Sequence, residues 1–121
     1  MPDQRRKLVK LLRLEIEEIL DTLADAESLS AVRREREEIT EYVFKENGAL
    51  YHLEEESLRR LLGSVDAFDF SLYTDVAETS RALERMVREH VKDREEPEAV
   101  HRFVAAKIAK ALNYVNAGDN P

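Results

Sequence analysis

Residues 39–65 read ITEYVFKENGALYHLEEESLRRLLGSV, and the spacing of their apolar side chains decides the fold. In an α-helix each residue turns about 100° around the axis, so side chains three or four positions apart share a face. Placed on such a helix, the apolar residues of this stretch form one stripe about 80° wide. Its members are Ile39, Val43, Leu50, Leu61 and Val65. We therefore expect an amphipathic helix here.

The dipeptide Asn47-Gly48 lies inside this stretch and is a strong turn signal, because both residues tolerate positive φ. The apolar stripe nevertheless keeps its phase on both sides of the dipeptide, and a turn would have no reason to preserve it. We therefore expect one long helix over 30–62, which begins at a capping serine and ends before Gly63. The internal glycine should cost about 1 kcal/mol relative to alanine.

Apolar residues recur at the same spacings on either side of this helix, and they predict three more helices with one buried face each. The three helices cover residues 3–24, 72–93 and 97–116, and a loose tail follows at 118–121. Short polar residues in the segment DAESLS, 25–30, indicate the first turn, because their side chains can cap a helix. Ser71 or Thr74 would cap the third helix, and Pro97 suits the first turn of the last one.

The composition agrees with a single helical domain. The chain has 121 residues, enough to bury a core without disulfides, and 37% of them are charged while Gly and Pro number three each. Short connections place neighbouring helices antiparallel. The sequence therefore predicts an all-α fold, an up-down antiparallel bundle of about four helices with a long second helix.

Several functional classes are excluded or disfavoured by composition. The absence of cysteine excludes disulfides, thiolate catalysis and cysteine-ligated zinc, and it is compatible with a reducing compartment. Charged residues interrupt the first apolar stretch, and no run approaches 18 apolar residues, so we expect neither a secretory signal nor a membrane span, and a cytoplasmic location. A net charge of −7 argues against general nucleic-acid binding.

The long second helix would reach about 50 Å and the other three about 30 Å, so part of its apolar stripe would protrude. Self-association, as a homodimer, or docking on another protein would cover such a stripe. The candidate interface residues are Leu11, Leu14, Val43, Leu50, Phe68 and Phe70. For the first two the alternative is an ordinary exposed leucine, and for the two phenylalanines it is a lid over one end of the bundle.

Histidines and carboxylates are the remaining candidates for chemistry. His90 and His101 would lie level on two antiparallel helices, with Glu98 one turn from His101, and these three could hold a metal. A di-iron site needs two Glu-x-x-His pairs, and only the pair of Glu98 and His101 exists. The alternative is that His90 interacts with its helix dipole and His101 packs in the core.

No phosphate-binding loop, HExxH motif or nucleophile elbow is present, so we expect no catalytic residue and no cofactor. Three functional hypotheses follow. The first is a non-enzymatic helical interaction module, such as an adaptor, assembly factor or regulatory subunit. The second is a small metal-binding bundle or enzyme that uses His90, His101 and Glu98. The third is a nucleic-acid-associated subunit with arginine-rich edges. The missing catalytic signature favours the first hypothesis.

Overall fold

The computed structural model describes residues 3–93 and 98–118, with side chains up to residue 90, at 102 and over 104–117. This part of the chain forms four α-helices and one short 3-10 turn and contains no strand. The helices are α1 Gln4–Glu35, α2 Glu41–Asp66, α3 Val76–Asp93 and α4 Glu98–Gly118, and the 3-10 turn is η1 Phe70–Leu72. The predicted all-α bundle of four helices is confirmed.

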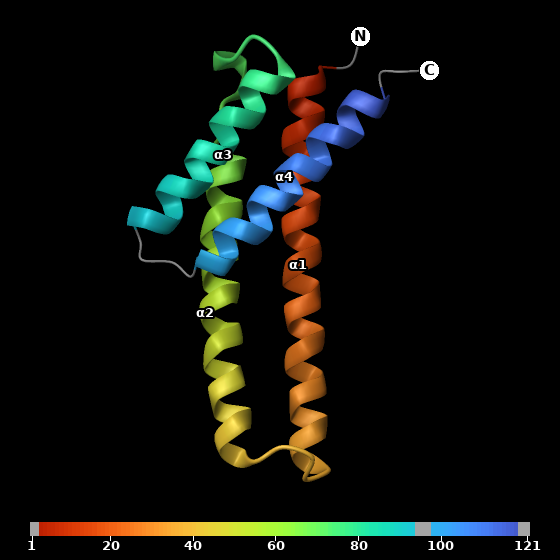
Figure 1. Ribbon diagram of the computed structural model, residues 1–121, viewed down its shortest axis with the longest axis vertical. Coiled ribbons are helices and arrows are strands. Elements are labelled where there is room, and N and C mark those ends of the chain that lie inside the picture. Colours follow the sequence, from red (N-terminus) through yellow and green to blue (C-terminus); the bar gives the residue numbers. More distant parts are fainter. Residues whose placement is uncertain (1–2, 94–97, 119–121) are drawn as a thin grey trace.

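The two longest helices, α1 and α2, lie side by side as an antiparallel hairpin (Figure 1). Arg13 contacts Asp66 at 3.3 Å near one end of the hairpin, and Arg34 contacts Glu41 at 3.7 Å near the other. Helices α3 and α4 also run antiparallel, and they lie across only one half of the hairpin. The N-terminus of α1 and the C-terminus of α4 are both at this covered end.

The hydrophobic core lies where α3 and α4 cover the hairpin. All four helices contribute, because each presents apolar side chains at helical spacing to the same space. The core members are Leu8, Leu12, Ile16, Leu58, Leu61, Val65, Leu83, Val87, Val104, Ile108, Ala111 and Val115. Leu61 and Val65 belong to the stripe predicted for residues 39–65, and the other members recur at spacings of three or four residues within each helix. The apolar residues Val91, Val100 and Phe103 fall in the predicted helices 72–93 and 97–116, and they lie outside the described side chains.

The predicted turn at 25–30 is wrong, because α1 continues through that segment to Glu35. Capping residues terminate a helix only where the chain turns away, and inside a helix aspartate and serine cost no more than about 0.7 kcal/mol each. In α1 the side chains of Asp25 and Ser28 are exposed, while Ser30 is buried. The segment therefore remains helical at small cost.

The chain instead reverses at 36–40, without glycine or proline. The amide of Glu38 donates to the carbonyl of Arg33 at 2.8 Å, and the amide of Glu37 donates to the carbonyl of Arg34 at 3.0 Å. This pair of bonds is a Schellman motif, and it requires the left-handed conformation at Glu37, whose φ is 59°. Thr40 then caps α2 by accepting a bond from the amide of Val43.

The second helix begins at Glu41 rather than at residue 30, and α1 is the longer helix, with 32 residues against 26. As predicted, Asn47-Gly48 does not interrupt α2. The prediction that Gly63 ends this helix is wrong, since α2 continues to Asp66. Neither glycine has positive φ, and a Cβ at either position would meet no atom within 4 Å. The backbone therefore makes no demand for glycine at these two positions.

The remaining boundaries agree more closely with the sequence. Helix α3 begins at Val76 rather than near residue 72, because Asp75 is its cap and accepts a 2.7 Å bond from the amide of Glu78. Helix α4 begins at Glu98, and the expected role of Pro97 lies outside the described residues. The tail predicted at 118–121 also falls outside them after Gly118.

Among the described residues, none of the helices is both long enough and apolar enough to cross a membrane.

Candidate interaction surface

One half of the hairpin extends beyond α3 and α4 (Figure 1). We call it the distal hairpin, and it comprises residues 24–35 of α1, the turn at 36–40 and residues 41–53 of α2. Within 24–53, all of which the structure describes, Ser30 is the only buried residue. The distal hairpin therefore has almost no core of its own, although two paired helices ordinarily need further helices to bury their apolar faces.

The apolar stripe of the covered half nevertheless continues into the distal hairpin. Val43 precedes Leu61 by 18 residues, which is five whole turns at about 3.6 residues per turn. Leu29 follows Leu11 by the same number of residues. In the covered half Leu61 is completely buried, and Leu11 packs against the core. Val43 and Leu29 therefore lie on the same side of the hairpin as Leu61 and Leu11. In the covered half, α3 and α4 pack on this side.

Four side chains on or beside this side form what we call the distal apolar surface. Leu53 lies at its edge, about 80° around α2 from Val43. Leu29 is 58% exposed, Val43 39%, Leu50 50% and Leu53 54%. The first belongs to α1 and the others to α2, so the surface spans both helices of the hairpin. Apolar side chains that share one face of two helices, without a covering layer, are typical of a surface that contacts another protein.

The seam between α1 and α2 is loosely packed at this level. A hollow of about 90 Å³ opens on the side of Leu29 and Asn47, and one of about 230 Å³ opens on the opposite side, beside Gly48 and His52. Ser30 lines both hollows, and its buried hydroxyl makes no hydrogen bond to the described residues. The two hollows show that Leu29 and Gly48 face opposite sides of the hairpin.

Of the six predicted interface residues, three are exposed in the structure and three are wholly or partly covered by the chain itself. Val43 and Leu50 belong to the distal apolar surface, and Leu14 is 51% exposed on α1, outside it. Leu11 and Phe68 pack against the core, and Phe70 is half-buried. Two members of the surface were not among the predicted residues. Leu53 lies in the helix predicted over 30–62, and Leu29 lies in the turn predicted at 25–30. The spacing of Leu29 from Leu11 could have revealed it.

The segment with the two phenylalanines covers the end of the bundle that holds the chain termini. The ring of Phe68 stacks on Tyr73 with centroids 5.6 Å apart and nearly parallel planes. The guanidinium of Arg5 lies 5.6 Å from the centroid of Phe70, and that of Arg6 lies 5.7 Å from it. Contacts inside the chain thus occupy both rings, as a lid requires.

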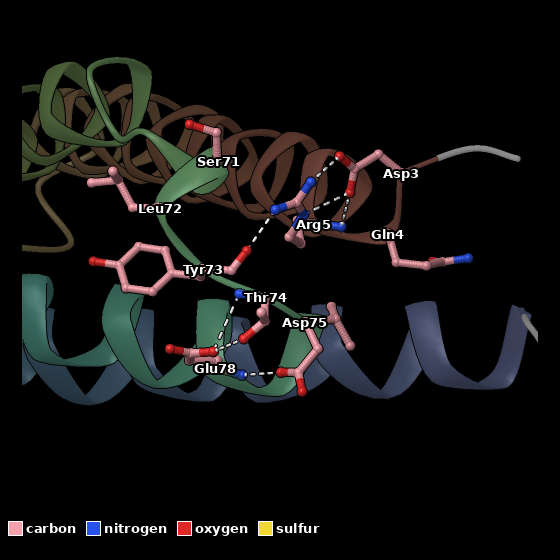
Figure 2. Close-up of a pocket in the computed structure, with 10 residues that line it drawn as sticks. Asp3, Gln4, Arg5, Ser71, Leu72, Tyr73, Thr74, Asp75 and Glu78 are labelled. Atoms are coloured by element: carbon pink, nitrogen blue, oxygen red, sulfur yellow. Dashed lines mark hydrogen bonds and ion pairs between the residues drawn. The ribbon is translucent and has the colours of Figure 1, made fainter.

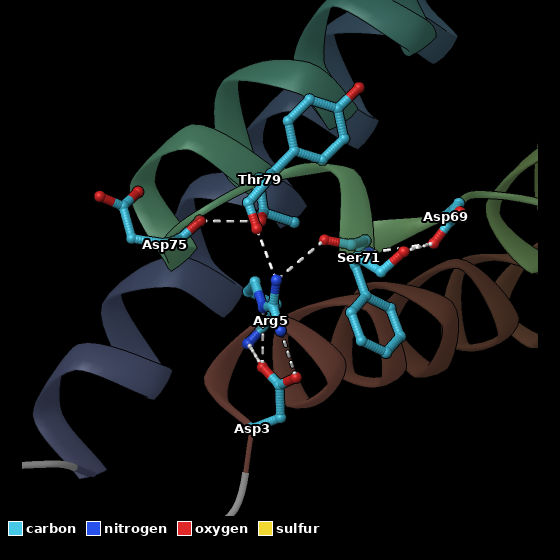
Figure 3. A network of polar contacts seen from close by, with 8 residues as sticks. Asp3, Arg5, Asp69, Ser71, Asp75 and Thr79 are labelled. Carbon is cyan, nitrogen blue, oxygen red and sulfur yellow. Dashed lines mark hydrogen bonds and ion pairs between the residues drawn. The ribbon is translucent and has the colours of Figure 1, made fainter.

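Arg5 fastens this lid to the start of α1 (Figures 2 and 3). Its guanidinium donates to the carbonyl of Tyr73 at 2.5 Å and to the carbonyl of Phe70 at 3.4 Å. The same group forms an ion pair with Asp3 at 2.8 Å, and this contact lowers the pKa of the Asp3 carboxyl to about 2. Sequence reasoning could not find this network, because the lid follows Arg5 by more than 60 residues.

A hollow of about 930 Å³ lies between Arg5 and the first turn of α3 (Figure 2). Several of its polar groups bond to one another. Asp75 caps α3 through the amide of Glu78, and the carboxylate of Glu78 accepts bonds from the amide and hydroxyl of Thr74. These bonds from Thr74 lower the pKa of Glu78. The arrangement caps the first turn of α3 and holds the loop that precedes it, which is a structural role.

A second charged cluster joins α1 to α4. The carboxylate of Glu15, of which 17% is exposed, lies 2.9 Å from the ammonium of Lys107 and 3.0 Å from that of Lys110. The hydrogen bonds from these two lysines lower the pKa of Glu15. The cluster therefore fixes how α4 crosses α1, and its charges are used within the chain.

The predicted metal site is only partly within the described structure. His90 is buried on α3, while the side chains of Glu98 and His101 lie outside the described residues. Among the side chains that are described, no three His, Asp or Glu residues are grouped so that they could hold a metal ion. The site of His90, His101 and Glu98 stays a prediction.

Comparisons with models of protein families, with curated proteins and with solved structures found no match to this chain.

Proposed function

We propose that the chain is a non-enzymatic helical interaction module whose contact surface is the distal apolar surface. The observation that carries the proposal is the exposure of Leu50, 50%, and of Val43, 39%, on the same stripe as Leu61 and Val65, which belong to the core. In the covered half of the hairpin this stripe is buried by two further helices. The distal half offers the same face to helices from another protein chain.

The covered half of the molecule supplies a rigid base for this surface. Its core is closed by side chains of all four helices, and the lid and the Glu15 cluster fix its connections. The distal hairpin is a direct continuation of the same two helices, so its position relative to the base is defined. A surface held in this way loses little conformational freedom on binding, which favours affinity.

Site-specific photo-crosslinking in the native host tests the proposal. A photoreactive phenylalanine analogue would replace Leu50, and in a control chain it would replace Leu14, which is equally exposed at 51% but lies outside the surface. We expect covalent protein adducts from position 50 and few from position 14. Equal yields from the two positions, or no adducts from either, would refute the proposal.

A further inference from the structure

We infer that the distal apolar surface binds a second copy of this chain. The two copies lie antiparallel, and each distal hairpin covers the part of the other hairpin that α3 and α4 leave uncovered. The inference rests on the proposed function and names its partner. Three features of the structure carry it: the unequal lengths of the helices, the side of the hairpin on which α3 and α4 lie, and the placement of charges around Leu29.

The unequal helix lengths leave a space of defined size. Helix α1 has 32 residues and spans about 48 Å, whereas α3 has 18 residues and spans about 27 Å. About 20 Å of the hairpin face therefore has no covering layer. The missing layer is two helices wide and one helix thick, about 8 to 10 Å. The distal hairpin of a second copy is itself two helices wide and one helix thick, so it fits this space.

The position of α3 and α4 selects the relative orientation of the two copies. Leu61 is buried among α3 and α4 residues, and Val43 lies on the same line of α2, so layer and surface share one side of the hairpin. Two parallel copies placed face to face would bring both α3–α4 layers into the same volume. Antiparallel copies avoid the collision, because each layer then lies beyond the tip of the other hairpin.

The charges beside the surface agree with this orientation. Arg33 and Asp25 lie four residues after and four residues before Leu29 on α1. A two-fold axis that passes beside Leu29 brings Arg33 of one copy to the level of Asp25 of the other. Both side chains are exposed, and Arg33 also lies 3.4 Å from Glu38 of its own chain. Parallel copies would instead place like charges together, which is unfavourable.

The size of the surface indicates a reversible dimer. The uncovered face extends about 20 Å along the hairpin and about 20 Å across two helices, or roughly 400 Å² for each copy. The total of about 800 Å² is below the usual range for stable protein interfaces and is typical of weak, transient contacts. We therefore expect a weak dimer that dissociates at micromolar concentrations.

Sedimentation equilibrium of the full chain, from about 1 to 500 µM, tests the inference. We expect a monomer–dimer equilibrium in the wild type. Leu50→Glu should raise the dissociation constant at least about tenfold, and Leu14→Glu, an equally exposed leucine outside the surface, should change it less than about twofold. Circular dichroism would establish that both variants remain helical. A wild type that is monomeric at every concentration, or equal effects of the two substitutions, would overturn the inference.

Two further measurements test the antiparallel orientation. Arg33→Asp and Asp25→Arg should each weaken the dimer, and the double variant should recover most of the wild-type affinity if the two residues pair between copies. The chain has no cysteine, so single cysteines can be introduced without a background. Leu29→Cys should form an intermolecular disulfide readily and Glu37→Cys, at the tip, should not. Efficient cross-linking at the tip, or no recovery in the double variant, would contradict the antiparallel arrangement.

The photo-crosslinking experiment separates this inference from the proposed function. Adducts from position 50 with the mass of two copies support both statements. Adducts with another protein, together with a monomeric wild type, would overturn the second copy as the partner and leave the interaction module supported. The absence of specific adducts would refute the interaction module itself.

Discussion

Replacing Gly48 by alanine should stabilise the protein. Gly48 lies inside α2 with a helical backbone, and a Cβ at this position would meet no atom within 4 Å. Alanine therefore adds no steric strain. It removes the conformational freedom that glycine loses on folding, and in a helix interior the difference is about 1 kcal/mol.

This free energy corresponds to a measurable change in melting temperature. For 121 residues the entropy of unfolding is about 250 cal/mol/K, at about 2.1 cal/mol/K per residue. A gain of about 1 kcal/mol therefore raises the melting temperature by about 4 °C. Thermal and urea unfolding followed by circular dichroism, at a protein concentration of a few µM so that the monomer is measured, would determine the gain.

Gly63 provides a matched comparison in the covered half of α2, where a Cβ also meets open space. Gly63→Ala should stabilise by a similar or smaller amount, because it lies nearer the helix end, and the double variant should be additive. A neutral or destabilising Gly48→Ala beside a stabilising Gly63→Ala would refute the reasoning. It would mean that α2 is not a continuous helix at Asn47-Gly48, or that another group occupies this side of the hairpin in solution.

Three other substitutions test local features of the structure. Glu37→Gly should raise the free energy of unfolding by up to about 1 kcal/mol in urea titrations, because glycine adopts the left-handed conformation without strain. Glu15→Gln should lower it by about 1 to 2 kcal/mol at neutral pH, since two ammonium groups lose their ionised partner. Because the pKa of Glu15 is lowered in the folded chain, this difference should be complete above about pH 4.5, the ordinary pKa, and disappear as the pH falls through the folded value. Arg5→Gln should return the pKa of Asp3 from about 2 towards 3.8 in an NMR titration and accelerate amide exchange in 69–75; an unchanged Asp3 pKa would contradict the ion pair.

The helical class and most of the core could be predicted from residue spacing alone. Leu8, Leu12 and Ile16 are all completely buried, and so are Leu83 and Val87. Each group recurs at intervals of three or four residues, which places its members on one face of any helix they form. Burial of apolar surface is the dominant favourable term in folding. The spacing of apolar residues therefore indicates which face of each helix is buried.

The position of the first turn could not be predicted in the same way. The segment 25–30 carries the stronger local capping signal, whereas the true turn at 36–40 requires positive φ at a glutamate. Local preferences of this kind amount to about 1 to 2 kcal/mol or less. The pairing of α1 with α2, with contacts from Arg13 to Asp66 and from Arg34 to Glu41, determines where the chain reverses.

The sequence by itself determined that the chain is helical, which residues face inward on each helix and that Asn47-Gly48 does not break α2. Only the tertiary structure decided which parts of those inward faces are covered. Val43 and Leu61 are equivalent by spacing, yet Val43 is 39% exposed and Leu61 is completely buried. The physical reason is that periodicity reports the direction of a side chain around its own helix, whereas burial also depends on how far the neighbouring helices extend along it.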